Sequence, residues 1–470
     1  MARRDPIVTV ITLCLLNLFV VAAGVAVVNL TPERDLAPQP PAVAGRLIVS
    51  PQAGTSAAST AAPLPSASTL AAQLAEPMRL AGAPINAVVI DPITRKVLYD
   101  QRSQSPLVPA STTKIVTATA ALAALGADDR LTTKVVQSAK SAESGKPGTG
   151  IVLAGGGDPT LASRKVDGFP ERASLPDLAK RTAAALKAAG VKRVRLDYDT
   201  SMYDEPRPAP GWKSNYLPEG SVAPVTALAV DEGRARPNVC GEDSTAPRAA
   251  DPPLAAAQTF AQLLRRRGIH AQVGSKVTAP EGARELAAVQ SPPIPAMVEH
   301  MLECSDNDLA EALARHIAIK RNRSADFTGV RQAVHEVLAE LGVATGVEVY
   351  DGSGLSIRNR ITPAALAKII ALAASNRHPG LRPAITGLPV AGFSGTLDDR
   401  FDGDKAQAGA GTVRAKTGTL SDVSTLAGLA YDADGRVLAF AFMVNKVRST
   451  AAAQVALDRL AAVIAACGCP

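Results

Sequence analysis

The sequence predicts an α/β (α+β) fold in which an antiparallel sheet is flanked by helices and carries an inserted subdomain. Strand-like segments lie near both ends of the folded part, at 85–100 and at 412–447, and helical patterns dominate 294–374. Strands at the two ends of a chain can join in one sheet that the intervening helices cover. Residues 166–285 instead mix helix-like and strand-like segments, which indicates a separate α/β subdomain.

Apolar patterns and turn residues define the individual elements. Segment 85–100, "INAVVIDPITRKVLYD", predicts two short strands across a turn. Segment 412–447 predicts three strands, and "DADG" supplies the hairpin turn between the last two. "TTKVVQS" and "TGIVLAGGGDPTL" predict two further strands. Helices are expected from Ser111 to about Leu125 and over about Thr450–Ala466.

The chain is expected to divide into five consecutive parts. A transmembrane anchor or signal segment comes first. A disordered linker rich in Pro, Ala and Ser follows, with too few large apolar residues to offset the entropy of ordering it. The folded part is one domain in two pieces, with the α/β subdomain inserted between them. In residue numbers, the parts are 1–30, 31–68, 69–165, 166–285 and 286–470.

An uncharged apolar stretch runs from Ile7 to about Leu30, after Arg3 and Arg4. A helix of this length crosses the ~30 Å hydrocarbon core of a bilayer. The preceding arginines favour a cytoplasmic N-terminus, with the rest of the chain outside. A cleaved signal peptide is the alternative, although its apolar region is usually ~7–15 residues long. Both interpretations predict an extracytoplasmic protein, anchored to the bacterial cell membrane or secreted.

Composition and residue spacing exclude several classes of protein. The net charge of +7 is modest for 470 residues, and no basic stripe with interleaved aromatics occurs, so nucleic-acid binding is not expected. The five histidines lack metal-binding spacing and no nucleotide-binding glycine motif is complete, so neither a metal nor an organic cofactor is expected. Disulfides are permitted outside the cytoplasm, but the spacing of Cys240, Cys304, Cys467 and Cys469 leaves their pairing open.

Ser111 and Lys114 begin the alanine-rich helix and are the first candidates for chemistry. Residues three apart share one face of a helix, so the Lys114 amine can reach the Ser111 hydroxyl. A serine at a helix start is more often an N-cap. The S-x-x-K pattern is therefore weak evidence for a nucleophile by itself.

Two later stretches favour the nucleophile. "SDN" at Ser305–Asn307 begins a helix and "KTG" at Lys416–Gly418 lies on an expected strand. S-x-x-K, S-D-N and K-T-G each occur once, in this order. The same set marks serine acyl-enzymes that act on penicillins and cell-wall peptides. Three short patterns that agree in order and spacing make Ser111 a nucleophile rather than a helix cap.

The chain resembles the penicillin-binding D-alanyl-D-alanine carboxypeptidases/endopeptidases of the low-molecular-mass class C type, peptidase family S13. Besides the three motifs, "LAGGGDPTL" (153–161), "SDNDLAEAL" (305–313) and "YDGSGLS" (350–356) are similar to stretches typical of that family. The resemblance covers about residues 75–466. It implies a serine transpeptidase/β-lactamase-like fold, cleavage of the terminal D-Ala–D-Ala bond of peptidoglycan stem peptides, cleavage of cross-links as a further activity, and inhibition by β-lactams.

The resemblance also implies a role for each matching residue. Ser111 would form the acyl-enzyme. Lys114 would take the serine proton, which requires a pKa lowered by burial or by a neighbouring cation such as Lys416. Ser305 would relay a proton to the leaving amine, and Asn307 would donate to the substrate backbone. Lys416 would also attract the substrate's terminal carboxylate.

The strand after Lys416 is expected to bind the substrate, through Thr417, Gly418 and Thr419. Because Gly418 has no side chain, an extended substrate could lie beside it as an added strand. By analogy with the family, the backbone N–H groups of Ser111 and Thr419 would form the oxyanion hole.

Two other functions fit part of the pattern. A serine β-lactamase or esterase would share the scaffold, but the insertion and the additional family-like stretches argue against it. A catalytically idle cell-wall binding protein would not need to keep the catalytic residues of the motifs. In this chain all of the motif residues are intact. The oligomeric state stays open.

Overall fold

The structure is a computed structural model of the chain and describes residues 62–138, 150–165, 171–204, 208–234 and 247–468. The predicted membrane segment and almost all of the predicted linker lie outside these residues. Within them, none of the helices has the length and apolar character that a membrane crossing requires.

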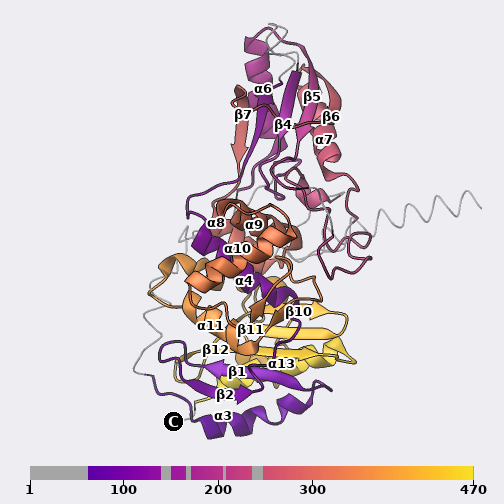
Figure 1. Cartoon of the computed structure of the whole chain (residues 1–470). Coiled ribbons are helices and arrows are strands. Elements are labelled where there is room, and N and C mark those ends of the chain that lie inside the picture. The colour runs from indigo at the N-terminus through magenta and orange to yellow at the C-terminus, as the bar shows by residue number, and fades with distance from the viewer. Residues whose placement is uncertain (1–61, 139–149, 166–170, 205–207, 235–246, 469–470) are drawn as a thin grey trace, which may run out of the picture. The chain divides into compact units, whose positions relative to one another are not determined.

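The first sheet is antiparallel and combines strands from both ends of the described chain, as predicted (Figure 1). Its strand order is β10-β11-β12-β1-β2. The first and last strands of the chain meet where β1 pairs with β12, with Ile85 opposite Val444. The strands are β1 (Ile85–Ile90), β2 (Val97–Gln101), β10 (Val413–Leu420), β11 (Val423–Tyr431) and β12 (Val437–Asn445).

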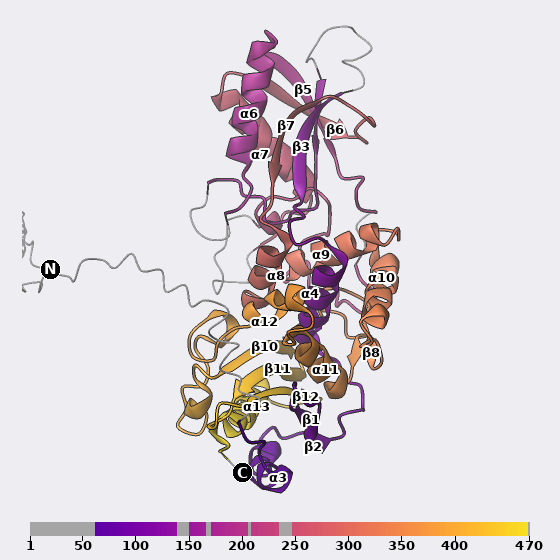
Figure 2. The same cartoon turned by 90° about the vertical axis from the view of Figure 1, so that its left-hand side faces the viewer.

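Helices cover both faces of this sheet, so its central strands are buried on both sides. Val88 and Ile90 of β1 belong to one core, and Ala87 and Val89 to the other, as the alternation of side chains along a strand requires. α11 and α13 lie on opposite faces (Figures 1 and 2). One core contains α4 (Thr113–Ala124), α8 (Ile294–Glu303), α9 (Asn307–Lys320), α10 (Phe327–Glu340), α11 (Pro363–Ala373) and α12 (Pro383–Thr386); the other contains α3 (Ala67–Leu74) and α13 (Thr450–Ala466).

Side-chain caps set the starts of several of these helices. Asp306, Asp326, Thr362 and Ser449 each accept a hydrogen bond from a backbone N–H group in the first turn. These residue types are favoured at N-caps because they satisfy donors that the helix leaves unpaired. The expected final helix over Thr450–Ala466 has the predicted bounds.

A second, mixed sheet forms the inserted subdomain, in the order β6-β5-β4-β3-β7. β4, β5 and β6 are parallel, and β3 is antiparallel to both β4 and β7. Two helices and the sheet share one hydrophobic core. The elements are β3 (Thr132–Gln137), β4 (Gly150–Ala154), α6 (Leu175–Ala188), β5 (Arg193–Asp199), α7 (Pro252–Arg266), β6 (His270–Lys276) and β7 (Glu285–Gln290).

This subdomain begins earlier than the predicted boundary at residue 166. β3 and β4, assigned from the sequence to the first domain, pair with each other and with strands of the inserted sheet. The subdomain therefore extends from about Thr132 to Gln290. Local sequence identifies a strand, but distant partners decide which sheet it joins.

A short two-stranded ladder fixes the base of the "YDGSGLS" segment. β8 (Val347–Glu348) pairs antiparallel with β9 (Arg360–Ile361), and the loop 349–359 projects between them. Most of this loop is buried. The loop reaches the face of α4 that carries Lys114.

Candidate active site

Ser111 lies in a 3₁₀ turn, Ala110–Thr112, directly before α4. The α-helix starts at Thr113, two residues later than predicted. Ala110 has a φ of 49°, a left-handed conformation that costs a residue with a Cβ about 1 kcal/mol or more. Such strain persists only where surrounding contacts hold it; here the Thr113 hydroxyl donates to the Ala110 carbonyl at 2.8 Å. The turn places Ser111 on the wall of an open cleft.

The Lys114 amine is fully buried and meets three uncharged oxygens. Its Nζ lies 3.2 Å from Ser111 Oγ, 2.6 Å from Asn307 Oδ1 and 2.8 Å from the Ser353 carbonyl oxygen. A neutral amine has two N–H groups and one lone pair. When the amide and carbonyl oxygens accept the two N–H groups, the lone pair faces the Ser111 hydroxyl. This is the geometry of a base that takes the serine proton.

Burial lowers the pKa of Lys114 from 10.5 to about 8, while the negative charges of Asp306, Asp351 and Glu311 oppose that shift. A useful fraction of the amine is therefore neutral near physiological pH. Burial, one of the two causes expected from the sequence, is the largest cause of this lowered pKa.

Asn307, the first residue of α9, bridges Lys114 to the inserted subdomain. Its Oδ1 accepts from Lys114, and its Nδ2 donates to the Ser221 carbonyl at 2.8 Å. These partners dictate the orientation of the amide, since an amine can only donate here and a carbonyl can only accept. The amide nitrogen has a second N–H group, and its predicted donation to a substrate backbone stays a prediction.

Ser305 lines the same cleft as Ser111. Its φ is 56°, so the left-handed backbone position lies at the serine itself here, whereas in the first motif it lies at Ala110, next to Ser111. The proton-relay role expected for Ser305 stays a prediction. The neighbouring Cys304 is disulfide-bonded, one of the two structural roles that its position suggests.

Lys416 on β10 is fully buried, and its Nζ donates to the Thr417 carbonyl at 3.0 Å. Burial lowers its pKa well below 10.5, and the charges of Lys114 and Arg400 lower it further. The two buried lysines are therefore electrostatically coupled. The Thr417 and Thr396 hydroxyls lie 2.8 Å apart at the cleft wall.

Gly418 is required by the packing of β10 against the turn that carries Ser111. A Cβ there would lie 2.2 Å from Thr425 Oγ1, 2.7 Å from the Pro109 carbonyl oxygen and 3.1 Å from the Ser111 nitrogen. The glycine thus lets the strand approach the nucleophile's own backbone. From the sequence, the missing side chain of Gly418 was expected to make room for the substrate. The structure adds a second reason for a glycine here, the close contact with Pro109 and Ser111.

The cleft has a volume of about 580 Å³. It brings together four of the predicted site residues, from the 3₁₀ turn, the segment before α9 and β10, and adds a wall from α13 and from the segment before β10. The lining residues are Ser111, Ser305, Thr396, Asp399, Arg400, Asp402, Thr417, Thr419, Ala451, Gln454, Val455 and Asp458. Lys114, Asn307 and Lys416 lie behind this wall, with the two lysines buried.

Asp158, from the "LAGGGDPTL" stretch, caps a turn. Its Oδ1 accepts from the Thr160 backbone N–H at 2.9 Å and from the Thr160 hydroxyl at 2.6 Å. The sequence did not identify the backbone carbonyls of Ser221 and Ser353 as contacts of the site, because a carbonyl contact carries no residue-type signal.

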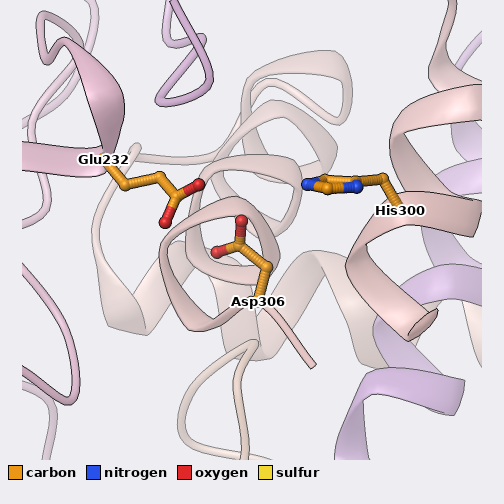
Figure 3. Close-up of side chains that lie close together, drawn as sticks. All are labelled: Glu232, His300 and Asp306. Carbon is orange, nitrogen blue, oxygen red and sulfur yellow. The ribbon is translucent and has the colours of Figure 1, made fainter. Parts of the chain in front are cut away.

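Among the described residues, Glu232, His300 and Asp306 have donor atoms within 4.8 Å of one another and could in principle hold a metal ion (Figure 3). Arg172 lies 3.1 Å from His300 Nε2, and Arg234 donates to Glu232 Oε2 at 2.9 Å. Because a guanidinium can only donate, Arg172 occupies the lone pair of His300 Nε2, and Arg234 occupies one of the two oxygens of Glu232. The three residues belong to a buried network of acids and arginines behind the S-D-N motif.

Comparisons with known proteins identify the family. The family model "D-Ala-D-Ala carboxypeptidase 3 (S13) family" matches residues 66–248 and 235–466. The chain belongs to the S13 family. Among S13-like relatives, the chain is 35% identical to "Carboxypeptidase Rv3627c" of Mycobacterium tuberculosis, over 92% of this chain and 89% of that protein. It is 37% identical to "Carboxypeptidase DacB" of Mycolicibacterium smegmatis, over 86% of this chain and 84% of that protein.

A solved structure supports the S13 fold. The crystal structure of penicillin binding protein 4 (dacB) from Haemophilus influenzae has a TM-score of 0.67 and 23% identity, and covers 84% of this chain and 97% of that chain. The predicted fold class, a serine transpeptidase-like α/β fold with an inserted subdomain, is confirmed. The family and its curated members make the chain a serine-type D-Ala-D-Ala carboxypeptidase.

Proposed function

We propose that Ser111 is the nucleophile of this DD-carboxypeptidase and Lys114 its general base. Ser111 Oγ attacks the carbonyl carbon of the penultimate D-Ala while its proton passes to Lys114 Nζ. The C–N bond then breaks, the amine of the terminal D-Ala takes up a proton that Lys114 returns by way of Ser305, and an ester remains on Ser111. Water hydrolyses the ester by the reverse proton path and releases the shortened stem peptide.

One observation carries this assignment. The buried Lys114 amine has two short contacts to carbonyl-type oxygens and a longer contact to Ser111 Oγ. That pattern suits a neutral amine whose lone pair points at the hydroxyl. A solvated lysine beside a helix cap would be charged and would need none of these partners.

The substrate is held, in this proposal, along β10. The backbone N–H groups of Ser111 and Thr419 stabilise the developing oxyanion, a contribution of about 3–4 kcal/mol per donor in other enzymes. Lys416 supplies the positive charge behind the strand that attracts the substrate's carboxylate. The same geometry suits an amide that follows a D-centre in a cross-link, so endopeptidase activity is proposed as well.

The proposed location is outside the cytoplasm, with the chain anchored through the apolar segment at 7–30. Its length and the two arginines before it support this. The anchor predicts that the full-length chain stays in the membrane pellet after an alkaline carbonate wash. Release into the supernatant would instead favour the cleaved-signal alternative.

Intact-mass spectrometry of the chain with benzylpenicillin tests the catalytic assignment. We expect one long-lived penicilloyl adduct, mapped by peptide analysis to Ser111 and absent from Ser111→Ala. Destruction of the drug without a stable adduct would favour a β-lactamase. Intact drug without an adduct would favour a binding protein, and Ser111 would then be no more than a residue of the turn before α4.

A further inference from the structure

The loop at 351–356 lies outside the three motifs and supplies one of the two short contacts of the Lys114 amine. The Ser353 carbonyl accepts from Lys114 Nζ at 2.8 Å. The position of this carbonyl, and with it the position of the amine, depends on how firmly the loop is held. The question is therefore what fixes this loop.

Glu311 of α9 binds the backbone of this loop. This carboxylate is completely buried on α9, one turn after Asn307. Its Oε1 accepts from the Gly352 N–H at 3.1 Å and from the Ser353 N–H at 2.8 Å. A single oxygen thus binds the two peptide units that flank residue 352. The next peptide unit, which carries the Ser353 carbonyl, is held by the Gly354 N–H, which donates to Asp351 Oδ1 at 3.0 Å.

The loop is also pressed against α4 and its preceding turn. The Thr117 hydroxyl donates to the Gly352 carbonyl at 2.7 Å. Gly354 has a φ of 90°, and a Cβ there would lie 2.0 Å from the Ala110 carbonyl oxygen. The loop therefore packs directly on the backbone beside Ser111. The chain between the Glu311 contact and the reacting atoms is tightly packed.

We propose that Glu311 is a positioning residue for the general base: through the Gly352 and Ser353 N–H groups it anchors the backbone that leads into the Ser353 carbonyl, and so helps to aim the Lys114 lone pair at Ser111. This inference rests on the proposed function. It assigns a specific task to the "SDNDLAEAL" stretch beyond the S-D-N residues that begin it.

Glu311 also acts on Lys114 electrostatically. Its negative charge, like those of Asp351, Asp306 and Asp308, raises the pKa of Lys114 against the effect of burial. Lys416 is the other titratable group coupled to Lys114. Arg315 pairs with Glu311 at 3.3 Å and offsets part of this charge. Loss of the Glu311 charge should thus move the pKa of Lys114 downward, whereas loss of its acceptor oxygens should misplace the amine.

Two substitutions separate these effects. Glu311→Gln removes the charge but keeps an oxygen that can accept from both N–H groups, and Glu311→Ala removes both. We expect Glu311→Gln to shift the midpoint of the acylation-rate profile to lower pH, with a plateau rate within about threefold of the parent protein. Glu311→Ala should shift it similarly and also lower the plateau by about 10- to 100-fold, within the range of a general base that loses its position.

The measurement is the second-order rate constant for acylation of the full chain by benzylpenicillin, from pH 6 to pH 10. The end point of acylation counts the folded sites, so a loss of stability does not mimic a slow rate. Asp91→Asn is the matched control. Asp91 is completely buried and pairs with Arg436 at 2.7 Å, but it does not line the cleft, so this variant should lose stability while keeping the parent profile.

The outcomes are distinct. If the parent chain is not acylated on Ser111, the proposed function fails. If the parent is acylated and Glu311→Ala keeps its plateau rate, only the role of Glu311 is overturned. Should Glu311→Ala not fold, Thr117→Val removes the tie to the Gly352 carbonyl; slower acylation at the plateau supports the positioning of the loop, and an unchanged rate overturns it.

Discussion

At the scale of single residues, the site depends on uncharged oxygens around a buried amine. Lys114 has acids nearby, yet its direct partners are Ser111 Oγ, Asn307 Oδ1 and the Ser353 carbonyl. A carboxylate in direct contact would hold the amine in its charged form. Neutral acceptors instead satisfy the N–H groups and allow the amine to lose its proton at moderate pH.

The pH dependence of acylation follows from this arrangement. The base is the neutral amine, and burial places the pKa of Lys114 at about 8. Acylation by benzylpenicillin should therefore rise with pH from 6 and reach half its maximum near pH 8. Lys114→Ala should lower the rate about 100-fold or more and remove this rise. A flat profile for the parent chain would contradict the assignment of the base.

The sequence predicted the motif residues but not all of their contacts. Side-chain patterns identify Ser111, Lys114 and Lys416, because their chemistry depends on residue type. They cannot identify the carbonyls of Ser221 and Ser353, which any residue could supply. They also left two causes open for the lowered pKa of Lys114, because burial is a property of the folded chain.

At the scale of elements, β10 and the turn before α4 behave as one unit. They come from opposite ends of the chain, and they touch at Gly418. The sequence predicted both elements, yet it could not predict that they lie in contact in the folded chain. For the same reason the strands at 132–137 and 150–154 were expected in the first domain, although their pairing partners place them in the inserted sheet.

Gly418→Ala tests the contact between β10 and the nucleophile turn. Its methyl group would overlap Thr425 Oγ1 and the Pro109 carbonyl, so strand or turn must shift. We expect acylation to slow by about 100-fold, since small displacements at reacting groups have effects of that order. Gly380→Ala is the control, because a Cβ there has no atom within 4 Å. Equal rates for the two variants would refute the contact's importance.

The segment around Trp212 ties the inserted subdomain to the Asp351 loop. The indole N–H donates to the buried Asp351 carboxylate at 2.8 Å, and the ring meets Phe327 edge to face. Trp212→Phe should lower the free energy of unfolding by about 2 kcal/mol, because a buried carboxylate loses a donor. Urea unfolding followed by circular dichroism measures this, since Trp212 is the only tryptophan. Phe393→Leu, at an exposed ring, should change nothing.

At the scale of the whole molecule, the inserted subdomain meets the helical part through a buried set of charges, of which Figure 3 shows Glu232 and Asp306. Glu232 of the subdomain, Asp306 and Asp308 at the start of α9, and Asp158 after β4 lie near Arg172, Arg234 and Arg248. The acids outnumber these arginines. Burial raises the pKa of Glu232 to about 8 and the pKa values of Asp158 and Asp308 to about 6.

Raised carboxyl pKa values make the folded state bind more protons than the unfolded chain between about pH 4 and pH 8. Their stabilising effect is present at low pH and is lost as pH rises through the folded pKa, at up to about 1.4 kcal/mol per pH unit for each proton. Glu232→Gln removes one such group. Relative to the parent, this variant should therefore gain at least about 1 kcal/mol in unfolding free energy between pH 5 and pH 8.

Urea unfolding of both chains at pH 5, 6.5 and 8 measures that difference. The matched control is Glu340→Gln, because Glu340 is exposed and its pairing with Arg321 lowers its pKa; it should show no such gain. A Glu232→Gln difference that stays constant or falls as pH rises would mean that Arg234 and Arg248 keep Glu232 ionised. The subdomain would then be joined to the helices by satisfied ion pairs, and its attachment would not weaken at alkaline pH.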